Sequence, residues 1–317
     1  MHAPLPAPFT DLTLDLPDRR VGKVRISYGL PDDERLFVTT DRLSAFDRVV
    51  AAVPYKGQVL NELAAWWFAN TADIVANHVR GIPDPNVTIG VEATPLPVEV
   101  VVRGYITGVT STSLWRRYSE GERVIYGYAL ADGMTQHQAL DTPIITPTTK
   151  AHAGAHDEPI TCAEVVQGGH VDAAIWAKVE AAALALFARG QRIATDAGLI
   201  LADTKYEFGL DPEGELILID EMHTPDSSRF WVAATYESRI ANGDDPESLD
   251  KEPIRRALIA AGYDGNGPSP DLGADVVAET STRYINAFER LTCRPFQPGS
   301  YPVEPRLTEA LHRAGVL

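Results

Sequence analysis

The chain has 317 residues, of which 44% are hydrophobic and 23% charged, and its formal net charge is −16. A chain of this length and ordinary composition buries a sizeable core and has room for two or three lobes. The negative charge opposes non-specific binding to nucleic acid or to an anionic membrane. We therefore expect neither nucleic acid nor a membrane as a partner, although a local group of cations can still bind a small anion.

The lack of a targeting segment and of a cysteine framework indicates the cellular compartment. No apolar run approaches the roughly 20 residues of a membrane-spanning helix, and residues 1–18 are proline-rich and acidic, unlike a secretory signal. Cys162 and Cys293 lie far apart, so a disulfide framework or a cysteine zinc site has no support. We expect a cytoplasmic protein and start from a monomer, although the sequence does not determine the number of subunits.

Two strands are predicted near the N-terminus, at residues 22–28 and 35–40. Lys23 and Arg25, after Gly22, would share one face of the first strand and could cover the phosphates of a nucleotide. The segment matches neither GxxxxGK[ST] nor GxGxxG. A charged strand edge explains the same residues, so both interpretations stay open.

The next segments combine apolar elements with polar connections. Residues 40–47 form a polar connection rich in capping residues, and apolar residues recur at helical spacing over residues 59–71. Residues 98–102 predict a buried strand interrupted only by Glu99, and Arg103 at its end fits an anion clamp.

Two loops carry further polar candidates. Ser111 and Ser113 lie in a hydroxyl-rich loop before a short helix, where they could donate to phosphate or cap the helix. Residues 147–159 contain Lys150, His152 and His156, but glycine and proline predict a loop, and HExxH is absent. A zinc site of paired histidines is therefore not expected.

A charged hairpin follows a long amphipathic helix predicted over residues 171–197. Alternation places Asp203, Lys205 and Glu207 on one face. With a four-residue loop at 211–214, Lys205 would lie opposite Asp220 and Glu207 diagonal to it. Two close carboxylates suit Mg²⁺, and Lys205 with Arg229 would supply the positive charge for a phosphate. A solvated face of cross-strand ion pairs is the alternative interpretation.

The C-terminal part is predicted to be mainly helical. Helices are expected at residues 252–261 and 277–291, separated by a loop rich in glycine and proline. We find no constellation of chemically active residues there, so we expect a helical cap.

Seven segments resemble, in order, the SAICAR synthetase family (phosphoribosylaminoimidazole-succinocarboxamide synthase), in its longer form, over residues 12–296. They are GKVR at 22–25, TTDRLSAFD at 39–47, PYKGQVLN at 54–61, VVRGYITG at 101–108, TPTTKAHAGAHDEPI at 146–160, LADTKYEFG at 201–209 and IDEMHTPDSSRFW at 219–231. Each is a weak match alone, whereas all seven in the family's order are specific.

The resemblance implies an α+β fold with a kinase-like, antiparallel ATP lobe (residues 1–105), a central α/β lobe (106–240) and C-terminal helices (241–317), with the active site in the cleft between lobes. It implies an ATP-dependent ligase of purine biosynthesis that joins L-aspartate to the carboxylate of carboxyaminoimidazole ribonucleotide, releasing ADP and phosphate. The chemistry requires activation of that carboxylate, as an acyl phosphate, with Mg²⁺ and cations neutralising the transferred group.

The resemblance also assigns roles to individual residues. Gly22, Lys23 and Arg25 would contact ATP, Glu207 and Asp220 would hold Mg²⁺, Arg103, Lys205 and Arg229 would bind the ribonucleotide phosphate, Asp47 and Lys205 would be catalytic, and Lys150, His156 and Asp157 would form the aspartate pocket. No general base is assigned.

The sequence departs from the family at two positions. Ile26 replaces the usual aspartate, and Val109 replaces a serine whose task Ser111 or Ser113 would take over. The alternatives to the ligase are a small-molecule kinase on a related scaffold and a nucleotide-sensing module without catalysis.

Overall fold

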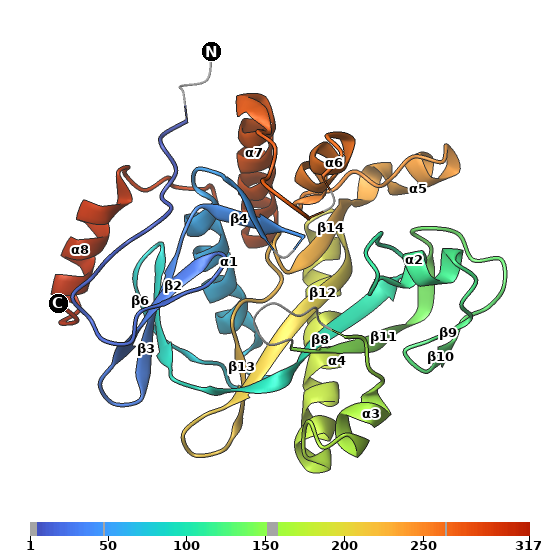
Figure 1. Cartoon of the computed structure of the whole chain (residues 1–317), viewed down its shortest axis with the longest axis horizontal. Coiled ribbons are helices and arrows are strands. Elements are labelled where there is room, and N and C mark those ends of the chain that lie inside the picture. The colour runs from blue at the N-terminus through green and yellow to red at the C-terminus, as the bar shows by residue number, and fades with distance from the viewer. Residues whose placement is uncertain (1–4, 47, 151–157, 264) are drawn as a thin grey trace.

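A computed structural model describes residues 5–46, 48–150, 158–263 and 265–317. Its first sheet is antiparallel and lies at one end of the molecule (Figure 1). In spatial order it contains β1 (Arg20–Val21), β2 (Arg25–Leu30), β3 (Glu34–Thr39), β7 (Val87–Val91) and β6 (Val79–Asp84). Ile26 and Tyr28 are fully buried on one face of β2, in a core shared with the C-terminal helix α8 (Val303–Arg313). The aspartate position of the family is thus occupied by a core side chain.

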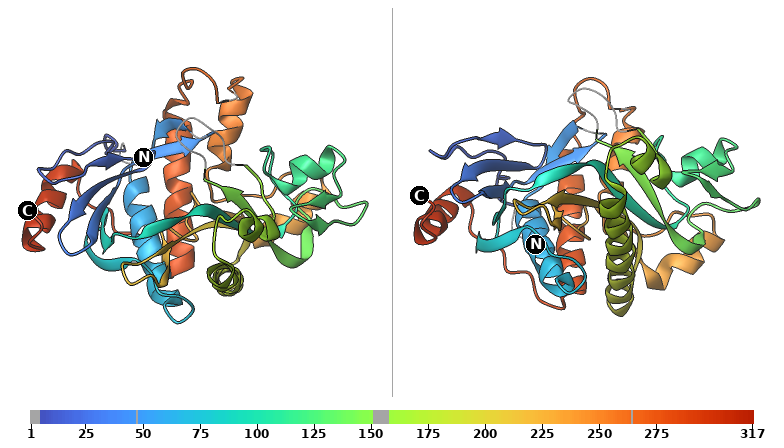
Figure 2. Two further views of the ribbon diagram at one scale, coloured as in Figure 1. Left: turned by 60° about the horizontal axis from the view of Figure 1, so that its bottom comes forward. Right: turned by 90° about the horizontal axis from the view of Figure 1, so that it is seen from below.

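The second sheet crosses the middle of the molecule. Its order is β11 (Ala139–Thr149), β8 (Thr94–Tyr105), β12 (Leu199–Leu210) and β13 (Leu216–Ile219), and β14 (Ser228–Val232) also pairs with β12. The long helix α4 (Ala173–Asp196) runs along this sheet (Figure 2). Val98, Val100 and Val102 of β8 are buried in the same core cluster as Leu186 and Phe187 of α4. The opposite face of the sheet therefore remains for polar residues.

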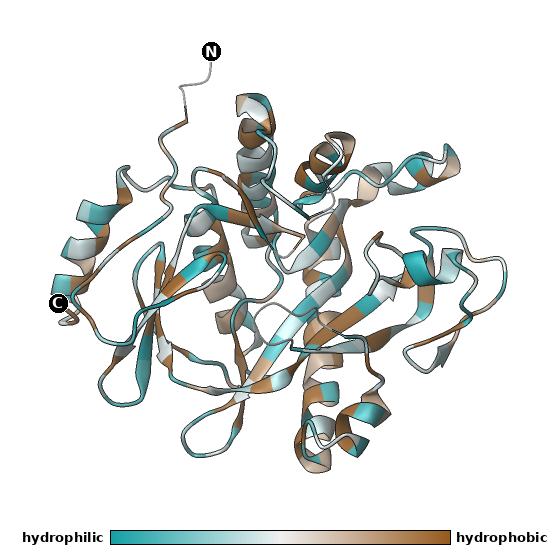
Figure 3. Ribbon diagram, in the orientation of Figure 1, coloured by the Kyte–Doolittle hydropathy of each residue, from teal (hydrophilic) through white to brown (hydrophobic). Residues whose placement is uncertain are grey.

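The remaining elements connect and cover the two sheets. They are β4 (Arg42–Ala45), β5 (Arg48–Ala52), α1 (Lys56–Thr71), α2 (Leu114–Ser119), β9 (Val124–Ile125), β10 (Tyr128–Ala129), α3 (Cys162–Gln167), α5 (Ala233–Ala241), α6 (Glu252–Ala260) and α7 (Gly273–Thr292). The hydropathy colouring shows strands and helices that alternate between apolar and polar residues (Figure 3). In the described part of the chain, no helix combines the length and apolarity needed to cross a membrane.

The predicted α+β class and antiparallel N-terminal sheet are confirmed, with several local corrections. Gly22, Lys23 and Val24 form a turn between β1 and β2, closed by a bond from the Gly22 amide to the Arg25 carbonyl (2.9 Å). The polar connection at 40–47 contains the strand β4. Helix α8 was not predicted, and it packs on the first sheet, where Arg306 pairs with Asp84 at 2.9 Å. Because β8 pairs with β12 from Thr94 and with β11 from Val98, the second sheet begins before residue 105; the lobe boundaries at 105 and 240 stay predictions.

Helix α4 approaches the loop after β13 closely at Gly190. A Cβ at position 190 would lie 2.0 Å from Cε1 of His223, a buried ring bonded to the Tyr206 hydroxyl at 2.6 Å. Gly190→Ala should therefore lower the free energy of unfolding by about 1–3 kcal/mol through overpacking, although alanine favours a helix over glycine. Urea unfolding measures the change. Ala185→Gly, on the exposed face of α4, reports the helix propensity alone, and a stabilised Gly190→Ala variant would contradict the packing described here.

Candidate active site

A cavity of about 530 Å³ lies between the two sheets. One wall is the turn of Gly22, Lys23 and Val24 with Arg25, and another is the polar face of β8 and β12. The loop after β13 and the start of α6 complete it. Because residues two apart in a strand share a face, burial of the valines of β8 against α4 directs Glu99 and Arg103 into the cavity.

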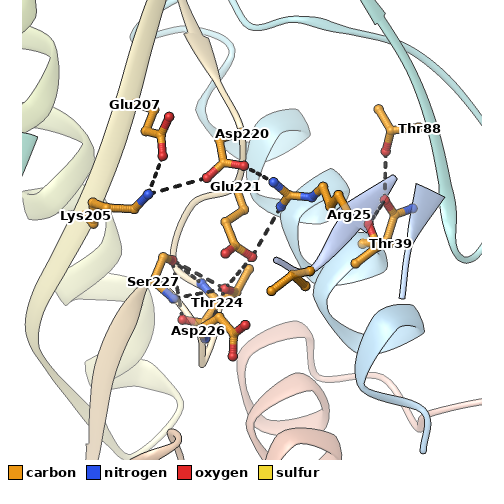
Figure 4. A network of polar contacts seen from close by, with 12 residues as sticks. Arg25, Thr39, Thr88, Lys205, Glu207, Asp220, Glu221, Thr224, Asp226 and Ser227 are labelled. Atoms are coloured by element: carbon orange, nitrogen blue, oxygen red, sulfur yellow. Dashed lines mark hydrogen bonds and ion pairs between the residues drawn. The ribbon is translucent and has the colours of Figure 1, made fainter. Parts of the chain in front are cut away.

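Lys205 stands at the centre of a cluster of carboxylates (Figure 4). Its ammonium contacts Glu207, lies 3.3 Å from Glu99 and lies 3.6 Å from Asp220. Glu99 and Glu207 are directly opposite each other in the β8–β12 ladder, so Lys205 neutralises two like charges that would otherwise repel. Glu207 also contacts Lys150. The predicted convergence of Lys205, Glu207 and Asp220 is therefore present.

The predicted hairpin register is wrong by one residue. Leu210 pairs with Leu216, so the loop covers residues 211–215, and Ile219 stands opposite Glu207. Such a shift by itself would turn Asp220 to the wrong face. Asp220 instead follows the end of β13 with φ = 67°, a left-handed conformation in which the chain changes direction. This single turn brings its carboxylate to Lys205.

The charges of this cluster hold each other ionised. Burial alone would lower the pKa of Lys205, but Glu207 and Glu99 outweigh it, so the pKa is raised above its ordinary value. Burial would conversely raise the pKa of Glu207, and Lys205 with Lys150 overcome it to lower the pKa well below its ordinary value. Glu207 is thus an anion and Lys205 a cation at neutral pH.

Arg25 connects the first sheet to the hairpin. Its guanidinium contacts Asp220 and lies 3.4 Å from Glu221, while Lys23 in the preceding turn lines the same cavity. The two predicted nucleotide-binding cations therefore face the cleft from the strand and its turn. Arg25 already contacts Asp220, one of the two carboxylates of the predicted metal site.

Arg103 and Arg229 meet at a single carboxylate. Asp203 in β12 is directly opposite Arg103 in β8 and Arg229 in β14, and it pairs with both, with 3.4 Å to Arg103. Arg103 also donates to the Thr146 hydroxyl at 2.8 Å. Burial lowers the pKa of Arg103, whereas Asp203 overcomes burial to raise the pKa of Arg229. Two oriented guanidinium forks at one end of a cavity suit a dianion such as a phosphate monoester.

The hydroxyl-rich loop lies beside these arginines. Ser113 is buried and lines the cavity, and its hydroxyl bonds Thr110 at 2.7 Å without capping the following helix. A Cβ at Gly108 would lie 2.4 Å from the Ser113 hydroxyl oxygen and 3.4 Å from Arg229, so only glycine permits this approach. Ser111 and Val109 are exposed and do not line this cavity. Of the two predicted replacements for the family serine, Ser113 is the one that reaches the site.

Comparisons with known proteins agree with this geometry. The family model described as SAICAR synthetase matches residues 19–270. The chain belongs to the SAICAR synthetase family.

Several relatives cover nearly the whole chain. A putative phosphoribosylaminoimidazole-succinocarboxamide synthase 2 of Mesorhizobium japonicum is 49% identical over 90% of this chain and 91% of its own. The synthase of Legionella pneumophila strain Paris is 44% identical over 98% and 99%. The Saccharomyces cerevisiae SAICAR synthase complexed with SAICAR superimposes with a TM-score of 0.78 at 32% identity, covering 91% and 99% of the two chains. A type-2 SAICAR synthetase in complex with ADP has a TM-score of 0.67 at 25% identity, covering 88% and 100%.

Several cavity residues were missed by the interpretation of the sequence. Glu99 was noticed only as an interruption of an apolar strand, and Asp226 lies within the family segment but received no role. Lys251 and Arg255 line the cavity from the segment predicted to be a cap without chemistry, which is a correction. The signal for Glu99 was available, since one carboxylate in a buried valine strand requires a cation nearby.

Lys56 and Asp226 form a buried pair behind the cavity. The Lys56 ammonium, fully buried at the start of α1, lies 2.8 Å from Asp226, which also accepts a hydrogen bond from the Tyr284 hydroxyl in α7. Burial would raise the pKa of Asp226, but Lys56 and Lys251 lower it to about 2. The pair ties α1 and α7 to the loop that carries Ser227 and leads into β14.

Three predicted residues lie outside the described residues: Asp47, His156 and Asp157. Lys150 is described, and it contacts Glu207. Its assignment to the aspartate pocket stays a prediction. Among the described residues, no group of three or more histidine, cysteine, aspartate or glutamate side chains is arranged to hold a metal ion. Mg²⁺ needs only one or two carboxylates when phosphate oxygens and water fill its octahedron, so Glu207 and Asp220 fit this ion as a pair.

The Lys56–Asp226 pair predicts a dependence of stability on acid. The pKa of Asp226 in the folded protein is below that of the unfolded chain, so its contribution to stability is complete above about pH 4 and is lost as the pH falls towards 2. Asp226→Asn should lower the free energy of unfolding at pH 7 by about 3–5 kcal/mol, because Lys56 is left buried without its partner. It should also flatten the decline in stability between about pH 4 and 2.

Urea unfolding at several pH values measures both effects. Asp196→Asn, at an exposed position near the end of α4, is the control and should change neither. An acid decline as steep in Asp226→Asn as in the unchanged protein would show that this pair is not its source.

Proposed function

We propose that this protein is an ATP-dependent ligase that joins L-aspartate to carboxyaminoimidazole ribonucleotide, giving SAICAR, ADP and phosphate. One observation carries the proposal: a single cavity holds a carboxylate cluster around Lys205 and, farther along the same sheet face, the two arginines paired with Asp203. The cluster suits a metal-bound triphosphate, and the arginines suit a second phosphate. A reaction between two phosphorylated substrates needs both.

ATP would enter from the side of the first sheet. A second cavity of about 250 Å³ lies between this sheet and the connection to β8, lined by Phe37, Val91 and Ile219 among others. It shares Glu207 and Asp220 with the main cavity. A purine base in this pocket would direct its phosphates past these two carboxylates towards Lys23 and Arg25. The ADP bound to the type-2 relative supports a nucleotide in this fold.

Mg²⁺ is the proposed ion, held by Glu207 and Asp220. Both side chains supply hard oxygen ligands, and the low pKa of Glu207 keeps it anionic. When bound, Mg²⁺ would neutralise negative charge on the phosphates of ATP. Lys205 and Lys150, which contact Glu207, would then be able to shift from carboxylate to phosphoryl oxygens.

The ribonucleotide would place its 5′-phosphate at Arg103, Arg229 and Ser113, with its imidazole carboxylate towards the cluster. Transfer of the γ-phosphoryl group to a carboxylate oxygen forms an acyl phosphate and releases ADP. The amine of aspartate then attacks the acyl carbon, the amide bond forms, and phosphate leaves with the oxygen through which it was attached. Lys205 is positioned by Glu99 and Glu207 to offset the negative charge that develops.

L-aspartate, the cellular compartment and the number of subunits are further parts of the proposal. L-aspartate is proposed as the amine donor because it supplies the succinyl group of the product. We propose a cytoplasmic monomer.

The decisive experiment measures ADP release with each of the three substrates omitted in turn. A ligase requires ATP, aspartate and the ribonucleotide together. The kinase alternative, which the comparisons do not favour, would release ADP without aspartate. A nucleotide-sensing module would bind ligand and release no ADP with any mixture.

Glu207→Gln should abolish most of the activity, because an amide binds Mg²⁺ weakly and cannot neutralise Lys205 and Lys150. We expect kcat to fall at least 100-fold and the Mg²⁺ requirement to rise, while thermal unfolding still shows a folded protein. Glu213→Gln, in the exposed turn of the same hairpin, is the matched control. Unchanged turnover at limiting Mg²⁺ would refute the metal role.

Arg229→Lys should raise the KM for the ribonucleotide at least tenfold and that for ATP less than twofold. A lysine cannot reproduce the bidentate fork that Arg229 presents beside Asp203 and Gly108. Steady-state kinetics with each substrate varied separately provide the measurement. Arg116→Lys, on the exposed helix α2, serves as control. Equal effects on both substrates would place Arg229 in the nucleotide site instead.

A further inference from the structure

The loop between β13 and β14 holds an uncommon backbone conformation at two places. Asp220 and His223 both have left-handed dihedral angles, with φ = 67° and φ = 51°. Residues other than glycine keep this conformation only where their surroundings impose it, and such residues gather at functional sites. Figure 4 shows the Asp220 carboxylate between Lys205 and Arg25. The direction of this carboxylate therefore depends on what holds the loop.

Two consecutive residues, Met222 and His223, anchor the loop to the core. Both are fully buried, whereas the preceding Glu221 lines the main cavity. The Thr71 hydroxyl of α1 donates to the sulfur of Met222 at 3.6 Å, and the His223 ring packs on the ring of Trp67, also in α1, with 4.6 Å between the ring centroids. One side of the loop is thus fixed by the core while the other side presents carboxylates to the cavity.

The His223 ring has a single hydrogen-bond partner among the described residues, Tyr206 of β12. Its Nε2 atom lies 2.6 Å from the Tyr206 hydroxyl oxygen, and its Nδ1 atom has no partner in the described part of the chain. Burial lowers the pKa of His223 to about 3, so the ring is neutral at neutral pH. The ring also meets α4 at Gly190, where a Cβ would lie 2.0 Å from Cε1. Packing and one hydrogen bond therefore leave the ring a single position.

Tyr206 connects this anchor to the charged face of the second sheet. It stands between Lys205 and Glu207 in β12, so its side chain projects to the opposite face, where it is fully buried. The hydrogen bond consequently joins the loop to the strand that carries Lys205 and Glu207. It fixes the loop three residues after Asp220, on the core side of the chain.

We propose that His223 and Tyr206 are positioning residues for the metal pair, because their hydrogen bond holds the Asp220 carboxylate beside Glu207 for joint binding of Mg²⁺. The inference rests on the proposed function, in which Glu207 and Asp220 are the ligands of this ion. His223 and Tyr206 touch neither substrate nor ion in this role. They act from the core, through the backbone of the loop.

Calorimetric titration of the full-length protein with ADP, with and without Mg²⁺, tests the proposal. Mg²⁺ should strengthen ADP binding at least tenfold in the unchanged protein. Tyr206→Phe removes only the hydroxyl, and it should reduce this strengthening at least fivefold while changing ADP binding without Mg²⁺ less than twofold. Tyr118→Phe is the matched control, since it removes another tyrosine hydroxyl, which donates to the Ala131 carbonyl at 2.8 Å, and it should change neither affinity.

Substitutions of His223 separate positioning from the filling of space. His223→Gln places a polar group near the position of Nε2 and should keep the Mg²⁺ effect on ADP binding within twofold of the unchanged protein. His223→Leu fills the space without a hydrogen bond and should lose the effect as Tyr206→Phe does. The Mg²⁺ concentration that gives half-maximal turnover should rise at least fivefold in the leucine variant alone. Thermal unfolding checks that each variant is folded.

Two results would overturn the inference: an unchanged Mg²⁺ effect in folded Tyr206→Phe, or equal effects of leucine and glutamine at position 223. A different result would overturn the proposed metal pair itself. In that case Mg²⁺ would not strengthen ADP binding in the unchanged protein, or Glu207→Gln would leave the strengthening intact.

Discussion

Burial of one face of the second sheet against α4 determines where the charges of the cavity point. Because side chains alternate along a strand, the valines of β8 and the apolar residues of β12 that pack into the core leave Glu99, Arg103, Lys205 and Glu207 on the other face. These charges cannot turn inward, since an unpaired ion in the core costs several kcal/mol. The core therefore orients the site, and a change in α4 packing is felt at the polar face.

The same sheet spaces the two functional ends. Along β12, Asp203 faces the paired arginines and Glu207 faces the carboxylate cluster, with Lys205 between them. The rise of about 3.3 Å per residue separates Asp203 and Glu207 by roughly 13 Å, which suits two phosphate sites flanking one reacting carboxylate. Strand geometry thus sets a distance that loops would hold less firmly.

The sequence allowed prediction of the elements whose signal is local. Helix α4, the hairpin and the shared face of Lys205 and Glu207 follow from periodicity, and these agree with the structure. The position of Asp220 did not follow from its register, because a left-handed residue at the strand end compensates for a longer loop. Lys56 and Glu99 were missed because their partners, Asp226 and Lys205, lie far away in the chain, and Lys251 because only the tertiary fold brings it to the cavity.

The distribution of charge reconciles an acidic protein with anionic substrates. The net charge of −16 is spread over the whole chain, whereas arginines and lysines project into one partly open cavity, where the lower dielectric strengthens each interaction. Most of these cations form ion pairs with carboxylates in the absence of substrate. These pairs keep the cations charged although they are partly buried. Binding an anionic substrate then exchanges one set of partners for another.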